Sequence, residues 1–284
     1  MTRIRNSIEL AKSSWKVIQA DRELLILPVI SGIVSVIVGA TFLIPLVAVG
    51  GFGGDTGSYV VLFVMYVALA YVTIFFNAAL VSAANERLNG GDPTLSSALA
   101  GARARAGKIL PWAIVSATVS IILRAIEERA GALGRIVAGL AGVAWAVVTF
   151  LVLPVIVIEG IGVTDAIKRS GEMFRRTWGE NLAAQVGFAV LGFVAVLPGI
   201  VLIIGSAFVG GGVLVAGILV GVLWMIGVAV VLSAMSIVFQ TALYHFAVDG
   251  SVPSGYYSTE TMATAFAPKS GARMPGFGGG FAGN

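Results

Sequence analysis

Six long apolar segments dominate this 284-residue sequence and constrain its fold more than any other feature. They cover approximately residues 24–49, 59–84, 109–126, 136–158, 182–208 and 213–246. Each can cross a membrane as a helix, because about 20 apolar helical residues span a hydrocarbon core of roughly 30 Å. Hydrophobic residues make up 58% of the chain and charged residues only 11%, unlike an ordinary water-soluble domain. The sequence predicts an all-α, polytopic membrane protein with six transmembrane helices.

Positive charge lies on one side of these segments. Fifteen of the eighteen Lys and Arg residues fall at alternate connections or at the chain ends, and only Arg124, Arg129 and Arg135 fall on the other side. Short cytoplasmic segments collect Lys and Arg, so the pattern predicts a plasma-membrane protein with both termini in the cytoplasm. A cleaved signal peptide is the alternative for the first segment. That segment is too long for a typical signal core, so we expect it to be retained.

Amphipathic helices are predicted before the first, third and fifth segments, on the positively charged side. Before the first, apolar residues recur at helical spacing with charged residues between them. These apolar residues are Ile4, Ile8, Ala11, Trp15 and Ile18. Similar stripes cover 95–109 and 167–178. Asp92 followed by Pro93 predicts the N-cap and first residue of the second helix. We therefore expect three cytoplasmic interfacial helices.

The chain then divides into three units, each with an interfacial helix, an outward segment and a return segment. Short matches in the return segments predict a threefold internal repeat, although such matches also arise by chance in apolar sequence. The matching phenylalanines are Phe76, Phe150 and Phe239, and the carboxylates nine or ten residues after them are Glu86, Glu159 and Asp249.

Residues 1–250 are expected to form one membrane domain, because the connections are too short to hold a soluble catalytic domain. Residues 251–284 are rich in Gly, Ser, Pro and Ala, which predicts a disordered cytoplasmic tail. Pro154 and Pro198 should bend the fourth and fifth segments, since proline removes a helical hydrogen bond. Gly217 and Gly221 form a small-xxx-small motif that allows close helix contact.

Groups that carry chemistry are sparse. The sequence has no cysteine and one histidine, His245, and no spacing of His, Asp and Glu resembles a metal site. His245 lies beside Tyr244 at the end of the last segment, where packing at the membrane interface is favoured over catalysis. We therefore expect no enzymatic activity, no metal and no cofactor.

Four polar residues could line a path through the membrane or join neighbouring helices: Asn77, Arg124, Glu159 and Gln240. Amides in membrane helices usually bond to neighbouring helices. Arg124 lies one turn before Glu127 and Glu128, so a solvated helix end with local ion pairs is its ordinary interpretation. A charge at depth is costly unless it is paired or hydrated, and a polar cavity around Arg124 is the alternative.

The carboxylates Glu86, Glu159 and Asp249 follow return segments, and an acid at a helix C-terminus is mildly unfavourable by itself. Cations on the same side would resolve this, and the candidates are Lys16, Arg22, Arg103, Arg105, Arg175 and Arg176. We expect a cytoplasmic belt of ion pairs that ties interfacial helices to return segments. The belt would be excluded if each of the three carboxylates lay farther than about 6 Å from every Lys and Arg nitrogen.

Several short motifs are shared with a known group of proteins. They lie at residues 14–15, 21–25, 28, 75–77, 86–88, 91–94, 159–160, 166, 176–180 and 239–244. On these motifs, nearly the whole chain before the tail resembles a prokaryotic family of six-span membrane proteins with no assigned function. The chain is also distantly similar to the membrane region attached to some glycerophosphodiester phosphodiesterases, whose catalytic domain has no counterpart in this sequence. The resemblance implies a fold and no activity.

These features favour a non-enzymatic integral membrane protein that acts through lipid or membrane-partner interactions at the cytoplasmic face. Anionic lipid headgroups are the expected partners, a membrane protein or a second copy of the chain is a further candidate, and nucleic acid is not expected. A small-solute transporter or channel is the alternative, and an intramembrane enzyme ranks third. The sequence does not name a substrate, a partner or an oligomeric state.

Overall fold

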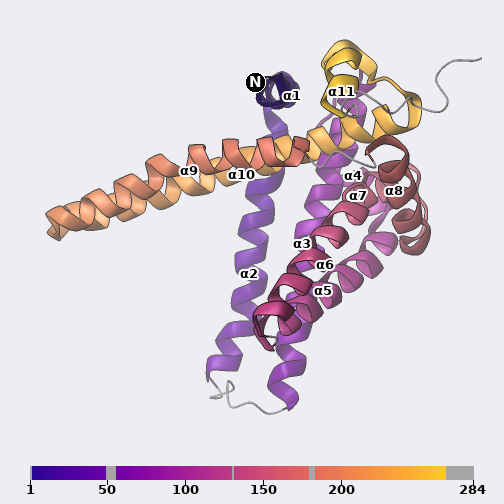
Figure 1. Ribbon diagram of the computed structural model, residues 1–284. Helices are drawn as coiled ribbons and strands as arrows, with labels where there is room; N and C mark the ends of the chain where they lie inside the picture. The colour runs from indigo at the N-terminus through magenta and orange to yellow at the C-terminus, as the bar shows by residue number, and fades with distance from the viewer. Residues whose placement is uncertain (1, 49–55, 130, 179–182, 267–284) are drawn as a thin grey trace, which may run out of the picture.

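The computed structural model describes residues 2–48, 56–129, 131–178 and 183–266, and within these ranges it contains helices and no strand. Figure 1 shows how the helices are arranged. The α-helices are α1 (Thr2–Ala20), α2 (Ile26–Ala48), α3 (Thr56–Leu88), α4 (Leu95–Ala104), α5 (Ala106–Arg129), α6 (Ala132–Thr149), α7 (Val152–Ile158), α8 (Val163–Trp178), α9 (Ala183–Val209), α10 (Gly211–Asp249) and α11 (Thr259–Phe266). Two 3₁₀ turns, η1 (Arg22–Leu25) and η2 (Pro253–Gly255), complete the described chain.

Within the described residues, six helical stretches are long and apolar enough to cross a membrane, which confirms the predicted number. They are Arg22–Ala48, Thr56–Leu88, Ala106–Arg129, Gly134–Ile158, Gly192–Val209 and Gly211–Asp249. The fourth combines α6 and α7, and the sixth is the single helix α10. These stretches identify an all-α membrane protein.

The three amphipathic helices predicted from the sequence are α1, α4 and α8, and they lie toward one end of the bundle (Figure 1). We call this end the charged end. We call the opposite end, where α2 and α5 end and α3 and α6 begin, the loop end. Each amphipathic helix leads into a helical hairpin: α2 with α3, α5 with α6 and α7, and α9 with α10.

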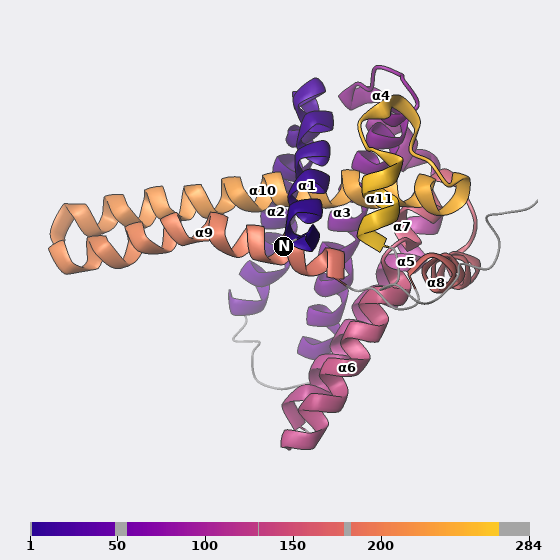
Figure 2. The same cartoon turned by 45° about the horizontal axis from the view of Figure 1, so that its top comes forward.

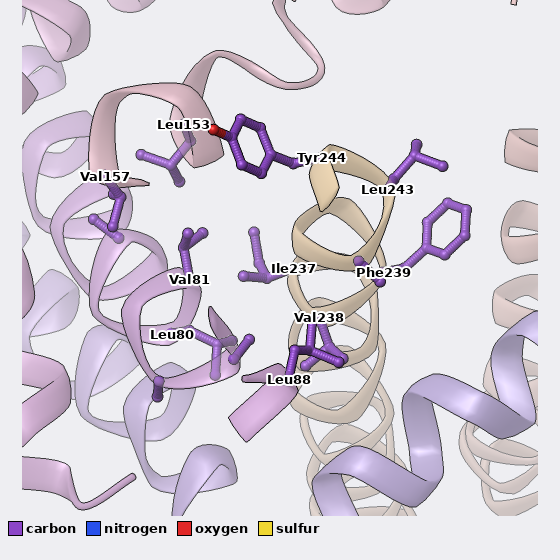
Figure 3. Packing of buried hydrophobic residues seen from close by; sticks show 14 of the residues in the cluster. Leu80, Val81, Leu88, Leu153, Val157, Ile237, Val238, Phe239, Leu243 and Tyr244 are labelled. Carbon is purple, nitrogen blue, oxygen red and sulfur yellow. The ribbon is translucent and has the colours of Figure 1, made fainter. Parts of the chain in front are cut away.

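The buried core lies at the charged end. It is built from the last three turns of α3, from α7, from the second half of α10 and from the apolar faces of the amphipathic helices. Figure 3 shows side chains of α3, α7 and α10 converging, with Val81 drawn between Val157 and Ile237. Fully burying one such aliphatic side chain contributes about 1.5–3 kcal/mol. The core therefore holds the three return helices together at this end.

The packing of the return helices is cyclic. The helices α3, α7 and α10 contact one another pairwise, and each also contacts the amphipathic helix of the following unit. Thus α3 contacts α4, α7 contacts α8, and α10 contacts α1. Because the last contact joins the third unit back to the first, the arrangement supports the threefold repeat predicted from the sequence.

The fourth span breaks where Pro154 predicts a bend. The helix α6 ends at Thr149 and α7 begins at Val152. Pro154 has no amide hydrogen to donate to the carbonyl of Phe150, four residues earlier, so the helical ladder is interrupted here. The buried Ser170 of α8 lies at the same break, where its Oγ accepts a hydrogen bond from the Leu151 amide at 3.2 Å. The break is thus part of the contact between α7 and α8.

The hairpin of α9 and α10 leaves the direction of the other spans and projects to one side, as both Figure 1 and Figure 2 show. Its helices are closely packed: a Cβ on Gly221 would lie 2.8 Å from the carbonyl oxygen of Gly199. Trp224 Nε1 donates to the carbonyl of Ala195 at 2.9 Å, in the turn before Pro198. This hydrogen bond joins the two helices of the hairpin directly.

The chain after residue 250 differs from the sequence expectation. Residues 251–266 form η2 and α11 and pack against α1, while the rest of the predicted tail lies outside the described residues. Val252, Tyr257 and Met262 are buried, and the Tyr257 hydroxyl lies 2.8 Å from Ser14 Oγ. Three apolar anchors thus override the Gly-rich and Ser-rich composition. Burial raises the pKa of the Tyr257 phenol above its ordinary value.

Candidate functional site

Arg87, near the end of α3, joins two acidic residues at the charged end. Its Nε and one terminal nitrogen donate to the two carboxylate oxygens of Asp21, and that nitrogen also donates to Asp92 Oδ1 at 2.7 Å. Asp21 lies between α1 and η1 and is 8% exposed. Such a bidentate pair is short and geometrically specific. Removing one partner of a buried pair typically costs about 3–5 kcal/mol, because the other charge stays buried.

Glu86 of α3 binds the start of α4, and it makes no ion pair with the part of the chain that the structure describes. Its Oε2 accepts a hydrogen bond from Ser97 Oγ at 2.9 Å. Thr94 caps α4 through its side chain and forms a capping box with Ser97. The expectation that Asp92 is the N-cap is therefore wrong: Asp92 binds Arg87, and the helix begins two residues after Pro93.

Glu159 follows α7 and joins three helices. Its Oε1 accepts from Arg169 Nε of α8 at 3.2 Å and from the Tyr244 hydroxyl of α10 at 3.0 Å. The carboxylate is largely buried, with 23% of the side chain exposed. A charge-assisted hydrogen bond to a partly buried carboxylate is stronger than one between neutral groups. Glu159 thus links the second unit to the third.

Two cations from the corner between α4 and α5 bind the C-terminal end of α7. Arg105 Nε donates to the Val157 carbonyl at 3.1 Å, and Lys108 Nζ donates to the Gly160 carbonyl. These carbonyls carry the partial negative charge of a helix C-terminus, so cations are favourable there. Gly160 has a φ of +65°, and a Cβ at this position would lie 2.9 Å from Arg105 Cζ.

His245 lies buried near the end of α10 and contacts two side chains. Its Nε2 is 2.8 Å from Asn85 Oδ1 of α3, and its Nδ1 is 3.4 Å from Asp249 Oδ2. Because an amide oxygen only accepts, Nε2 carries the proton in this arrangement. The histidine therefore connects the third return helix to the first.

Among the described side chains, the predicted belt of ion pairs has one contact with an arginine, between Glu159 and Arg169. Arg169 was not among the cations named from the sequence. Glu86 binds Ser97, and Asp249 lies beside His245. Within the described chain, none of the predicted cations forms an ion pair with the three carboxylates: Lys16, Arg22, Arg103 and Arg175 are exposed, and Arg105 binds a carbonyl. The side chain of Arg176 lies outside the described residues.

The four residues of the predicted polar path do not converge. Asn77 is half-buried in α3, Gln240 Nε2 donates to Ser236 Oγ one turn earlier in α10 at 3.3 Å, and Glu159 lies at the charged end. Arg124 lies at the loop end, where its side chain is exposed and its Nε is 3.8 Å from Glu128 Oε1. An open cavity of about 630 Å³ surrounds this pair and is lined by Arg124, Glu127, Glu128, Arg129, Gly131 and Arg135.

Sequence reasoning missed most of the contacts at the charged end. The pairs that it missed are Asp21 with Arg87, Glu159 with Tyr244, and Asn85 with His245. A signal was present, because Asp21, Arg87, Asp92, Glu159 and Tyr244 all lie in the motifs that carry the family resemblance. Those motifs mark residues that join the units to one another.

Among the described residues, no group of three or more His, Cys, Asp or Glu side chains could hold a metal ion. Comparison with known proteins gives a family and no activity. The model of a family of unknown function, DUF6159, matches residues 56–255. No curated protein matches the chain, so the expected similarity to glycerophosphodiester phosphodiesterases gains no support.

Proposed function

The chain belongs to this family of unknown function, and we propose that it is a non-enzymatic membrane protein whose charged end binds anionic lipid headgroups. In this proposal the protein lies in the plasma membrane, and the charged end and both termini face the cytoplasm. The excess of Lys and Arg on that side supports this orientation.

The observation that carries the proposal is a division of the cations at the charged end into two groups. Arg87, Arg105, Lys108 and Arg169 bind other parts of the protein. A second group is exposed and makes no ion pair within the described chain. This group, which we call the free cations, comprises Lys12, Lys16, Arg22, Arg103, Lys168 and Arg175. Five of the free cations lie on the amphipathic helices α1, α4 and α8, and Arg22 lies in η1, directly after α1.

Cations at this position can reach phosphate groups of the membrane surface. A Lys or Arg near an anionic leaflet contributes about 1 kcal/mol, and its long aliphatic stem lets the charge reach the interface. The acidic residues Asp21 and Glu159 are already bound by arginines. They therefore do not compete with lipid phosphates for the free cations.

The test replaces the free cations with Gln in one variant and replaces Arg124, Arg129 and Arg135 with Gln in a control variant. Each protein is extracted from vesicles that contain phosphatidylglycerol and phosphatidylcholine, and the retained lipids are measured by mass spectrometry. We expect the affinity for phosphatidylglycerol to fall about fivefold for each replaced cation that contacts a headgroup, since about 1 kcal/mol per cation corresponds to that factor. The control variant should retain the wild-type ratio. Equal ratios in the two variants would contradict the proposal.

Transport of a small solute is the second proposal, and the open cavity of about 630 Å³ around Arg124 favours it. A charged cavity at one end of a membrane bundle can serve as a solute entrance. Flux into proteoliposomes tests this proposal, with Arg124→Gln expected to reduce the flux. Substitution of Asn77 by Leu, at a half-buried position in α3, tests whether the path continues across the membrane.

A further inference from the structure

One contact is missing from the cyclic packing of the three units. The return helix α3 contacts α5, which begins the next hairpin, and α10 contacts α2 in the same way. The equivalent contact for the second unit would join α6 or α7 to α9. No comparable contact between these helices exists in the described chain. The reason is that the hairpin of α9 and α10 projects away from α6 (Figure 2).

The two surfaces that this contact would join are apolar and exposed. On α9, one row of exposed side chains at helical spacing consists of Phe193, Leu197, Val201, Ile204 and Phe208, and Val194, Leu202 and Val209 are exposed beside it. On α6, a matching stripe consists of Ile136, Leu140 and Val143. Spacings of three and four residues place each set on a single helix face. Both stripes therefore lack a protein neighbour where the repeat predicts one.

The hairpin is built to move as one body. Gly221 packs against Gly199, and Gly217 packs against Ser206 so closely that neither glycine has room for a side chain. Trp224 adds a hydrogen bond to Ala195. The anchor of the hairpin is the second half of α10, which is buried from Ala234 to His245. A change in direction of the hairpin must therefore bend α10 between these two regions. It must also bend the facing part of α9, because α9 contacts α1 and α11 and its Gly192 packs against Leu232 of α10.

Gly227 lies between the packed and anchored regions. A Cβ at Gly227 would meet nothing within 4 Å, so no close packing explains a glycine at this position. Glycine in a helix interior costs about 1 kcal/mol relative to Ala, and sharp bends in helices occur at glycine and serine positions. Ser233 follows within two turns. This segment is the natural bending point of α10.

The direction of the hairpin conflicts with a planar bilayer unless α10 bends. The helix α10 has 39 residues, which corresponds to about 58 Å at 1.5 Å per residue, roughly twice the thickness of the hydrocarbon core. Between Gly192 and Phe239 the hairpin has no charged residue, so this stretch belongs inside that core. Lying across α2 and α3, it cannot cross the same planar bilayer as those helices.

We propose that in the membrane the hairpin of α9 and α10 turns at Gly227 and places the exposed face of α9 on α6 of the same chain. This contact closes a ring of three hairpins around the buried return helices. It does not depend on lipid binding by the free cations. A second copy of the chain on α6, or lipid alone, are the competing occupants.

Cross-linking tests the proposal directly, because the chain has no native cysteine. The test pair is Leu140→Cys on α6 with Val201→Cys on α9, which are 67% and 64% exposed. Each position lies eight residues from the loop-end terminus of its helix, Ala132 or Val209, so the two should meet at the same depth. The control pair is Leu140→Cys with Val36→Cys on α2, where the repeat predicts no contact.

A short bismaleimide is applied to the full chain in bilayer vesicles, and products are separated by mass. We expect the test pair to cross-link within one chain at least about tenfold faster than the control pair, because the contact raises the effective concentration. Spin labels at the same two positions should show one short distance in bilayers. Equal rates for the two pairs, cross-linked dimers in place of monomers, or a long spin-label distance would each overturn the proposal.

Discussion

Within α3, the stretch from Ala78 to Leu88 packs among α4, α7 and α10, whereas the stretch that begins at Thr56 leaves Tyr59, Val60 and Phe63 exposed. The same division holds for α10, whose second half is buried and whose first half is exposed. Lipid chains are as apolar as leucine, so hydrocarbon offers no hydrophobic drive for helices to associate. Outside the close contact between α9 and α10, the buried core therefore lies at the charged end.

The largest expected difference between the charged end and the loop end concerns the ion pair of Arg87 and Asp21. Replacing Arg87 with Ala should lower the free energy of unfolding by about 3–5 kcal/mol, because Asp21 would stay buried without a partner. The measurement is the unfolding midpoint of the purified protein in mixed detergent. The matched control is Arg124→Ala at the loop end, where the exposed pair with Glu128 should contribute at most about 1 kcal/mol. Equal decreases would show that the two ends are equally important for stability.

Leucines at the two ends give the second test. Leu80 is fully buried in α3, while Leu140 of α6 is 67% exposed. Leu80→Ala should destabilise the protein by about 2–5 kcal/mol, because it removes buried apolar atoms and leaves a cavity. Leu140→Ala should change stability by no more than about 0.5 kcal/mol. The same unfolding assay applies to both variants. A large effect at Leu140 would mean that α6 is covered by protein in the tested state, as the closed ring predicts for the bilayer.

Glycines provide the third test. A side chain at Gly160 should be destabilising, because this residue combines a φ of +65° with close contact to Arg105. Gly160→Ala should lower the free energy of unfolding by about 1–3 kcal/mol, the usual cost of a non-glycine residue in a strained conformation. Gly142→Ala, in α6 with nothing within 4 Å of its Cβ, should be neutral or stabilise by up to about 1 kcal/mol. A neutral Gly160→Ala would show that the contact of Arg105 with α7 can rearrange.

Helix number and type followed from the sequence because apolar length alone fixes a span. The direction of the third hairpin did not, since α9 and α10 are apolar on all sides and no polar face specifies a neighbour. The contacts of the charged end were also hidden, because Asp21 and Arg87 lie 66 residues apart and Glu159 and Tyr244 lie 85 apart. Local spacing cannot reveal such pairs. The composition of residues 251–266 predicted disorder, but a few buried side chains decide the conformation of this segment.

The smallest predicted effect concerns the docking of α11 on α1. Tyr257 is fully buried, and burial raises the pKa of its phenol. A group whose pKa is raised on folding supports the folded state fully below its unfolded value, and this support falls as pH rises above about 10. Protection of the α11 amides from hydrogen exchange should therefore fall above that pH in the wild type.

Tyr257→Phe keeps the apolar contact and removes the hydrogen bond to Ser14, at a cost of about 1 kcal/mol. Its α11 protection should be lower at neutral pH and should lack the decrease that titration of Tyr257 causes. If the protection of the α11 amides decreased with pH in the same way in both proteins, another group would be responsible for the titration. Tyr257 would then not cause the pH dependence.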